Sequence, residues 1–142
     1  MAFLLPVKNA THLKSRPDVK PSSIRLFGAS RGGPLVVITA ARRPKDVAGA
    51  SAHVHTSCGI SWTGKPYYGW GVPGGYSPKN ADKSAALAKM SAYVDPVNHA
   101  EQVVCPITFG YGISDWGLSP PEGIEAAYVL AKSPWKRISR DA

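Results

Sequence analysis

The stretch SIRLFGASRGGPLVVIT, residues 23–39, decides the fold that the sequence predicts. Residues 23–27 and 34–39 are rich in branched and large apolar side chains, and the glycine-rich residues 28–33 separate them. Two β-prone runs joined by a short glycine-rich connector are typical of a β-hairpin. We therefore expect two antiparallel strands here, with Arg31 at the tip of the turn.

The rest of the chain extends this pattern. Residues 52–62 and 101–113 alternate between apolar and polar side chains, as half-buried strands do, and residues 67–72 are expected to form a return strand. Residues 77–94 and 119–132 are expected to be helices, since each begins with a serine followed by proline. These elements predict an α+β domain, an antiparallel sheet of about five strands with two helices on one face.

Both ends of the chain are basic and rich in proline or polar residues. At 142 residues the chain fits one domain. We expect residues 1–23 to form an extended basic arm, residues 24–134 to form a single α+β domain, and residues 135–142 to form a basic C-terminal tail.

The charge of the chain favours an acidic partner. It has 17 lysine and arginine residues against 9 acidic ones, a net charge of +8, and most of the excess lies in the first 50 residues. A localised positive field concentrates polyanions near a protein. We therefore expect a nucleic-acid partner, RNA in preference to DNA. The expected contacts are Lys8, Lys14, Arg16, Lys20, Arg25, Arg31, Arg42, Arg43 and Lys45.

Composition also bears on localisation. No apolar run approaches the length of a membrane span, so none is expected. The two cysteines do not make a disulfide framework, which favours an intracellular protein, cytoplasmic or within a virion if it is a coat protein. Cys58 and Cys105 fall on apolar strand faces and are expected to be buried and unreactive.

Two histidines lie close together in residues 52–62. His53 and His55 are two residues apart, so on a strand they point to the same side and can ligate one metal ion. His99 and Asp115 are candidate third ligands, although no spacing selects either. The alternative is a solvated polar strand face, and our prediction is that no metal or other cofactor is bound.

A wider pattern resembles the HUH endonucleases. His53, Val54 and His55 match their His-hydrophobe-His strand, and Tyr128 lies on a later helix with Lys132 four residues beyond. The resemblance implies a divalent metal on the histidines and a nucleophilic tyrosine that attacks phosphorus. It covers these positions only.

The sequence offers few other catalytic groups. We identify no glycine-rich phosphate loop in residues 28–33, no suggestive carboxylate pair and no serine nucleophile motif. The predicted function is that of a non-enzymatic structural subunit that self-associates and binds nucleic acid, coat-like or part of a ribonucleoprotein. The alternatives are a metal-dependent HUH-type single-strand endonuclease or transposase, and an accessory subunit of a large organellar or membrane-associated complex.

Overall fold

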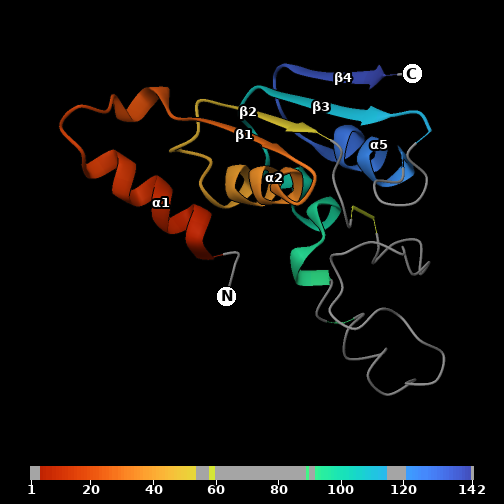
Figure 1. Cartoon of the computed structure of the whole chain (residues 1–142), viewed down its shortest axis with the longest axis horizontal. Coiled ribbons are helices and arrows are strands. Elements are labelled where there is room, and N and C mark those ends of the chain that lie inside the picture. Colours follow the sequence, from red (N-terminus) through yellow and green to blue (C-terminus); the bar gives the residue numbers. More distant parts are fainter. Residues whose placement is uncertain (1–3, 54–57, 60–88, 90–91, 115–120, 142) are drawn as a thin grey trace.

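A computed structural model of the chain describes residues 4–53, 58–59, 89, 92–114 and 121–141, and a parallel sheet lies at its centre (Figure 1). The described residues form four strands, which are β1 (Arg25–Ala29), β2 (Gly49–His53), β3 (Ile107–Gly112) and β4 (Lys136–Asp141). They lie side by side in sequence order, and every neighbouring pair is parallel. The carboxyl ends of all four strands therefore meet at one edge of the sheet.

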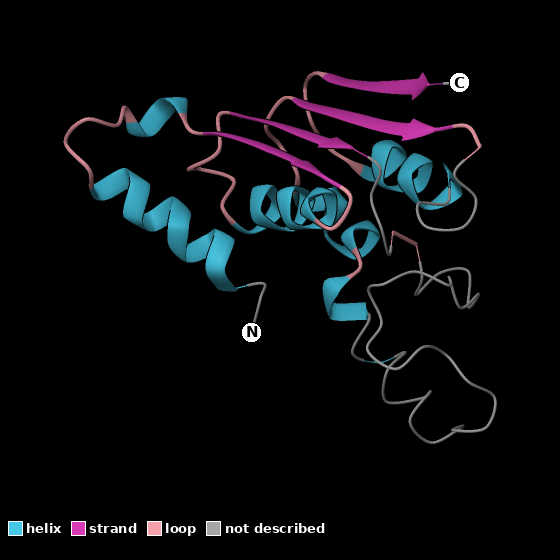
Figure 2. Ribbon diagram, viewed as in Figure 1, coloured by secondary structure: helices cyan, strands magenta, loops and turns pink. Residues whose placement is uncertain are grey.

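Helices connect the strands. The described helices are α1 (Leu4–Ser15), the 3-10 helix η1 (Pro21–Ser23), α2 (Gly32–Arg42), the 3-10 helix η3 (Pro96–Gln102) and α5 (Pro121–Leu130). Figure 2 shows α2 and α5 on the same face of the sheet. Strand–helix–strand connections of this kind are what parallel neighbours require, because a tight turn cannot join them.

The core lies between the sheet and these helices. Ile107 and Phe109 point from β3 toward the helices and are fully buried, as are Val37 of α2 and Ile124 of α5. The other face is open in the described residues, and Phe27 on that face of β1 is 78% exposed. One covered and one open face explain why the strands alternate between apolar and polar residues, a pattern that is more common in antiparallel sheets.

The predicted hairpin over residues 23–39 is wrong. Its first run is β1, but its second run, residues 34–39, lies inside α2. Pro34 stands in the first turn of that helix, where a missing N–H costs nothing. Residues 36–41 are all buried, so this part of the helix has no exposed polar face. Periodicity cannot distinguish a helix buried in this way from a buried strand.

The predicted antiparallel sheet is wrong for the same reason, because the connections are helical crossovers. The strand expected over residues 101–113 is shorter than predicted, since η3 occupies its beginning and β3 starts only at Ile107. Pro106 lies directly before β3, which is an inner strand of the sheet. The return strand expected over residues 67–72 lies outside the described residues, as does most of the helix expected over residues 77–94.

Both ends of the chain also differ from expectation. Leu4–Ser15 is the helix α1 and not an extended arm, with Pro6 in its first turn. The segment expected to be a basic tail contains β4, which pairs with β3 along its whole length. The division of the chain at residues 23 and 134 stays a prediction.

Candidate active site

A sharp turn joins β1 to α2 at the carboxyl edge of the sheet. Ser30 follows the last residue of β1 and has a φ of 51°, in the left-handed region that residues other than glycine rarely adopt. Its N–H donates to the carbonyl oxygen of His53 at 3.0 Å, and its own carbonyl accepts the N–H of Gly33 at 3.0 Å. Ser30 is exposed. The strand and the helix therefore hold this serine outward in a strained conformation.

Glycine is required on the strand side of the turn. A Cβ on Gly28 would lie 2.4 Å from the carbonyl oxygen of Gly32 and 2.6 Å from its carbonyl carbon. The backbone of α2 thus approaches that of β1 more closely than any side chain at position 28 allows. Residues 28–32 read Gly-Ala-Ser-Arg-Gly, the G-x-S-x-G pattern of a nucleophile elbow.

The expectation that the sequence contains no serine nucleophile motif is therefore wrong. The signal was available, since the pattern follows a predicted strand. It was lost because the apolar residues after it were assigned to a second strand, whereas the elbow requires a helix there.

The start of α2 supplies hydrogen-bond donors next to Ser30. The N–H groups of a helix's first turn have no partner within the helix and carry the positive end of its dipole. In a nucleophile elbow the N–H of the residue after the serine binds the oxyanion of the tetrahedral intermediate. In this chain that residue is Arg31, which caps α2.

A carboxylate follows β3 in the sequence. Asp115 comes three residues after Gly112, the last residue of β3, and lies outside the described residues. In this type of site the chain order is serine, acid and histidine, and Asp115 has the acid's place in that order. The four histidines are His12, His53, His55 and His99, so none follows Asp115.

The histidines are not gathered into a metal site in the described part of the chain. His53 ends β2, where its Nε2 lies 2.8 Å from the hydroxyl of Ser51 and its ring 5.9 Å from that of Phe27. His99 lies in η3, with its Nε2 2.9 Å from the carbonyl oxygen of Tyr93. His55 lies outside the described residues. Among the residues described, no group of three or more metal-ligating side chains is found.

Tyr128 and Lys132 also have ordinary structural surroundings. Tyr128 is half-buried on α5, and its ring meets that of Phe109 edge to face at 6.1 Å between centroids. The ammonium of Lys136 lies 5.1 Å from the centre of the Tyr128 ring. Lys132 is exposed and pairs with Glu101 at 3.8 Å. Tyr128 thus packs against the core.

The basic residues are spread over several elements. Lys14 of α1 and Arg43 both pair with Asp46, which lies between α2 and β2. Arg16 pairs with Asp18. The described members of the predicted nucleic-acid set therefore do not form one arm, and part of their charge is neutralised within the chain.

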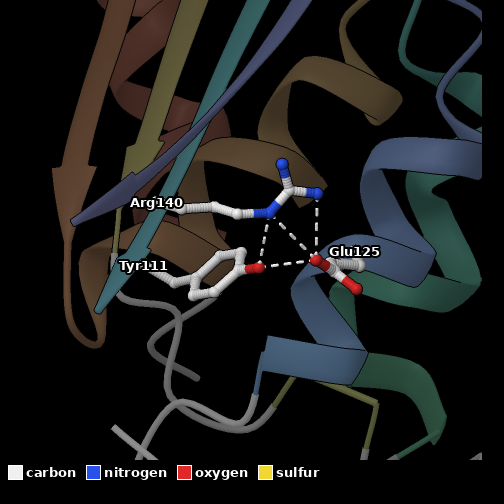
Figure 3. A network of polar contacts seen from close by, with 3 residues as sticks. All are labelled: Tyr111, Glu125 and Arg140. Atoms are coloured by element: carbon white, nitrogen blue, oxygen red, sulfur yellow. Dashed lines mark hydrogen bonds and ion pairs between the residues drawn. The ribbon is translucent and has the colours of Figure 1, made fainter. Parts of the chain in front are cut away.

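A polar network lies near the carboxyl edge, between the sheet and α5 (Figure 3). The hydroxyl of Tyr111 on β3 donates to Oε1 of Glu125 on α5 at 2.5 Å. Nε of Arg140 on β4 donates to the Tyr111 hydroxyl at 2.9 Å and to Glu125 Oε1 at 3.2 Å, and its Nη2 reaches the same oxygen at 3.1 Å. The Tyr111 hydrogen bond holds the pKa of Glu125 below its ordinary value, while burial raises the pKa of Tyr111.

The expected burial of the two cysteines is confirmed. Cys58 and Cys105 are both buried and unpaired. Burial raises the pKa of the Cys58 thiol well above its ordinary value, and the neighbouring Asp95 carboxylate adds to this; burial also raises the pKa of Cys105. A raised pKa leaves less of the reactive thiolate at neutral pH.

The arrangement of strands and helices is that of the α/β-hydrolase fold, and solved structures share this fold. The acetyl xylan esterase from Paenibacillus sp. R4 superimposes with a TM-score of 0.80 at 20% identity, over 99% of this chain and 45% of that one. Acetyl xylan esterase 1 from Thermoanaerobacterium sp. JW/SL YS485 gives 0.76 at 22% identity, over 99% and 45%. The monoacylglycerol lipase of Paleococcus ferrophilus gives 0.63 at 20% identity, over 98% and 63%.

The sequence itself is similar to an esterase. The acetyl esterase Axe7A of Xylanibacter ruminicola is 27% identical over 135 residues, which cover 93% of this chain and 29% of that protein. No protein-family model matches the sequence. The chain therefore spans less than half the length of these acetyl and acetyl xylan esterases.

These likenesses overturn the predicted function. Similarity to hydrolytic enzymes contradicts a non-enzymatic nucleic-acid-binding subunit, coat-like or otherwise, and also an accessory subunit of a large complex. They contradict the HUH-type nuclease as well, whereas they do not test the residues named for its site, His53, His55, Tyr128 and Lys132. The described residues contain no helix long and apolar enough to cross a membrane. The nucleic-acid partner, the self-association and the intracellular localisation stay predictions.

Proposed function

We propose that this chain carries the nucleophile and the acid of a serine-dependent carboxylic-ester hydrolase, with Ser30 as the nucleophile and Asp115 as the acid. The observation that carries the proposal is the left-handed φ of 51° at Ser30 between β1 and α2. This conformation is strained for serine, and backbone strain of this kind concentrates at functional sites. In the nucleophile elbow, this backbone conformation exposes the serine hydroxyl at the carboxyl end of the sheet.

The chemistry follows from this geometry. The Oγ of Ser30 attacks the ester carbonyl carbon and gives its proton to a general base, while the N–H of Arg31 stabilises the oxyanion. Collapse of the intermediate breaks the bond to the alcohol, which leaves with that proton. Water then attacks the acyl-serine ester, releases the carboxylic acid and restores the hydroxyl of Ser30.

Asp115 orients and charge-stabilises the general base in this scheme. The base is a histidine that follows the acid in the chain order of such sites. Residues 116–142 contain no histidine, so none of the four histidines of this sequence has that place in the order.

The proposed substrate is an O-acetyl ester on a saccharide. Its support is the names of the similar proteins, an acetyl esterase and two acetyl xylan esterases. The acetyl group is the smallest common acyl group, and a small acyl group in a hydrophobic site is distinguished from the next homologue by only about 1–3 kcal/mol per methylene. Butyrate has two methylenes more than acetate, so acetyl esters should be hydrolysed faster than butyrate esters by at least about 30-fold.

The test is hydrolysis of p-nitrophenyl acetate and acetylated xylan by the natural polypeptide that carries these residues, compared with its Ser30→Ala variant. We expect Ser30→Ala to lower kcat by at least about 1,000-fold and to abolish labelling by a fluorophosphonate probe. Ser22→Ala is the matched control, because Ser22 is an exposed serine in η1, away from the elbow. Hydrolysis that survives Ser30→Ala, or that is absent from the parent protein, overturns the proposal.

A further inference from the structure

The Tyr111–Glu125–Arg140 network joins the elements that bracket the proposed acid. Tyr111 is the last residue but one of β3, and Glu125 lies in the second turn of α5. The connection between these two elements includes Asp115. The hydrogen bond from Tyr111 to Glu125 therefore links the two ends of that connection, through residues 14 apart in sequence.

Arg140 ties in a third element. It is the last residue but one of β4 and is the register partner of Tyr111 in the parallel pairing of β3 with β4. Arg140 and Tyr111 thus lie side by side on the face that α5 covers, and the guanidinium reaches both the phenol and the carboxylate (Figure 3). The ends of β3 and β4 and the start of α5 are fixed to one another at the carboxyl edge.

Packing alone does not require a hydroxyl at position 111, because phenylalanine would fill the same space in the core. Phe109, two residues earlier on the same face of β3, is fully buried against the same helix without a hydroxyl. Tyr111 is 4% exposed, so its hydroxyl needs polar partners, and it donates to Glu125 on α5 and accepts from Arg140 on β4. The difference between these two positions is the cross-link to Glu125.

The network contributes modestly to global stability. The side chains of Arg140 and Glu125 are 53% and 43% exposed, and ion pairs this open to solvent stabilise folded proteins little. Its protonation state is also constant near neutral pH, because the pKa of Glu125 is lowered while those of Tyr111 and Arg140 are raised. Its main effect is therefore on local geometry.

We propose that Tyr111, Glu125 and Arg140 are positioning residues for Asp115, because they fix to one another the end of β3 and the start of α5, the two elements that precede and follow it in the sequence. This inference rests on the proposed function for the role of Asp115. Displacement of a catalytic group by about 1 Å can cost about 100-fold in rate. A cross-link at the base of the connection limits such displacement.

The test compares Tyr111→Phe with Tyr128→Phe in the natural polypeptide. Both variants remove one hydroxyl, from Tyr111 on β3 or from Tyr128 on α5, but only the first breaks the network. We expect Tyr111→Phe to speed amide hydrogen exchange in residues 113–120 several-fold, to leave residues 36–41 of α2 unchanged, and to lower kcat for p-nitrophenyl acetate about 10-fold with KM unchanged. Tyr128→Phe should change none of these quantities.

Two outcomes overturn the inference. One is unchanged exchange in residues 113–120 of Tyr111→Phe, and the other is an equal rise in α2, which reports general loosening. Glu125→Gln provides a second variant, since it keeps the shape but removes the charge that holds Arg140, and it should reproduce the local rise in exchange. The exchange measurement does not need turnover, so a parent protein without esterase activity sinks the proposed function and leaves this test intact.

Discussion

The N–H of Ser30 donates to the carbonyl oxygen of His53 at 3.0 Å, so the end of β2 holds the residue that follows β1. This bond continues the parallel ladder one step beyond the strand and fixes the backbone of Ser30 while its φ is left-handed. The serine is thus held by the sheet on one side and by the start of α2 on the other. A change to either side should disturb it.

Gly28→Ala should destabilise the protein, because the new Cβ would lie 2.4 Å from the carbonyl oxygen of Gly32 and backbone atoms must move to admit it. We expect a loss of about 2–3 kcal/mol in the free energy of unfolding, measured by urea denaturation. Gly32→Ala is the matched control, since a Cβ there meets nothing within 4 Å. It should be neutral or stabilising by up to about 1 kcal/mol. Equal effects of the two variants would contradict the close approach of β1 and α2.

Asp46 should make stability depend on pH in the acid range. Hydrogen bonds from Lys14 and Arg43 lower its pKa, so the interaction is present at neutral pH and is lost as the pH falls through the lowered value. Asp46→Asn should therefore be less stable than the parent at pH 7, and the difference should shrink below a pH of about 4. Urea denaturation at a series of pH values measures this.

Asp18→Asn is the control for that measurement. Asp18 also pairs with an arginine, but its side chain is 60% exposed against 12% for that of Asp46. Exposed pairs contribute little, so Asp18→Asn should change stability little at any pH. A pH-independent loss in Asp46→Asn would show that its charge is not the cause.

The thiols of Cys58 and Cys105 should be inert in the folded protein. Both are buried, and their raised pKa values reduce the thiolate fraction. A disulfide reagent at pH 8 should label neither thiol until denaturant is added, and should then label both. Rapid labelling of the native protein would contradict the packing of the 58–59 turn or of the residues before β3.

The sequence predicts the positions of β1 and α5 well and that of β3 in part. Ser119-Pro120 precedes α5, and apolar alternation marks β3. It does not predict how strands pair, since that depends on crossovers between segments distant in the chain. One face of this sheet is open in the described residues, so its alternation resembles that of an antiparallel sheet.

The candidate site was missed through one local error. Residues 34–39 are as suitable for a buried strand as for a buried helix, and the choice of strand turned residues 28–33 into a hairpin. With a helix in that place, the same glycines and Ser30 form an elbow. Neither the left-handed φ of Ser30 nor the polar network of Tyr111 could be predicted from the sequence, because both arise from contacts between separate elements.

The strain at Ser30 can be measured apart from its chemistry. Ser30→Ala and Ser30→Gly both remove the hydroxyl, so both should abolish ester hydrolysis. The two variants differ in the cost of the backbone conformation. A φ of 51° costs a residue with a Cβ about 1–2 kcal/mol. This cost exceeds the free energy of about 0.5–1 kcal/mol that the greater backbone entropy of unfolded glycine costs on folding. Ser30→Gly should therefore have a free energy of unfolding about 1 kcal/mol higher than that of Ser30→Ala, measured by urea denaturation. The reverse order would show that the elbow stores no backbone strain at this residue.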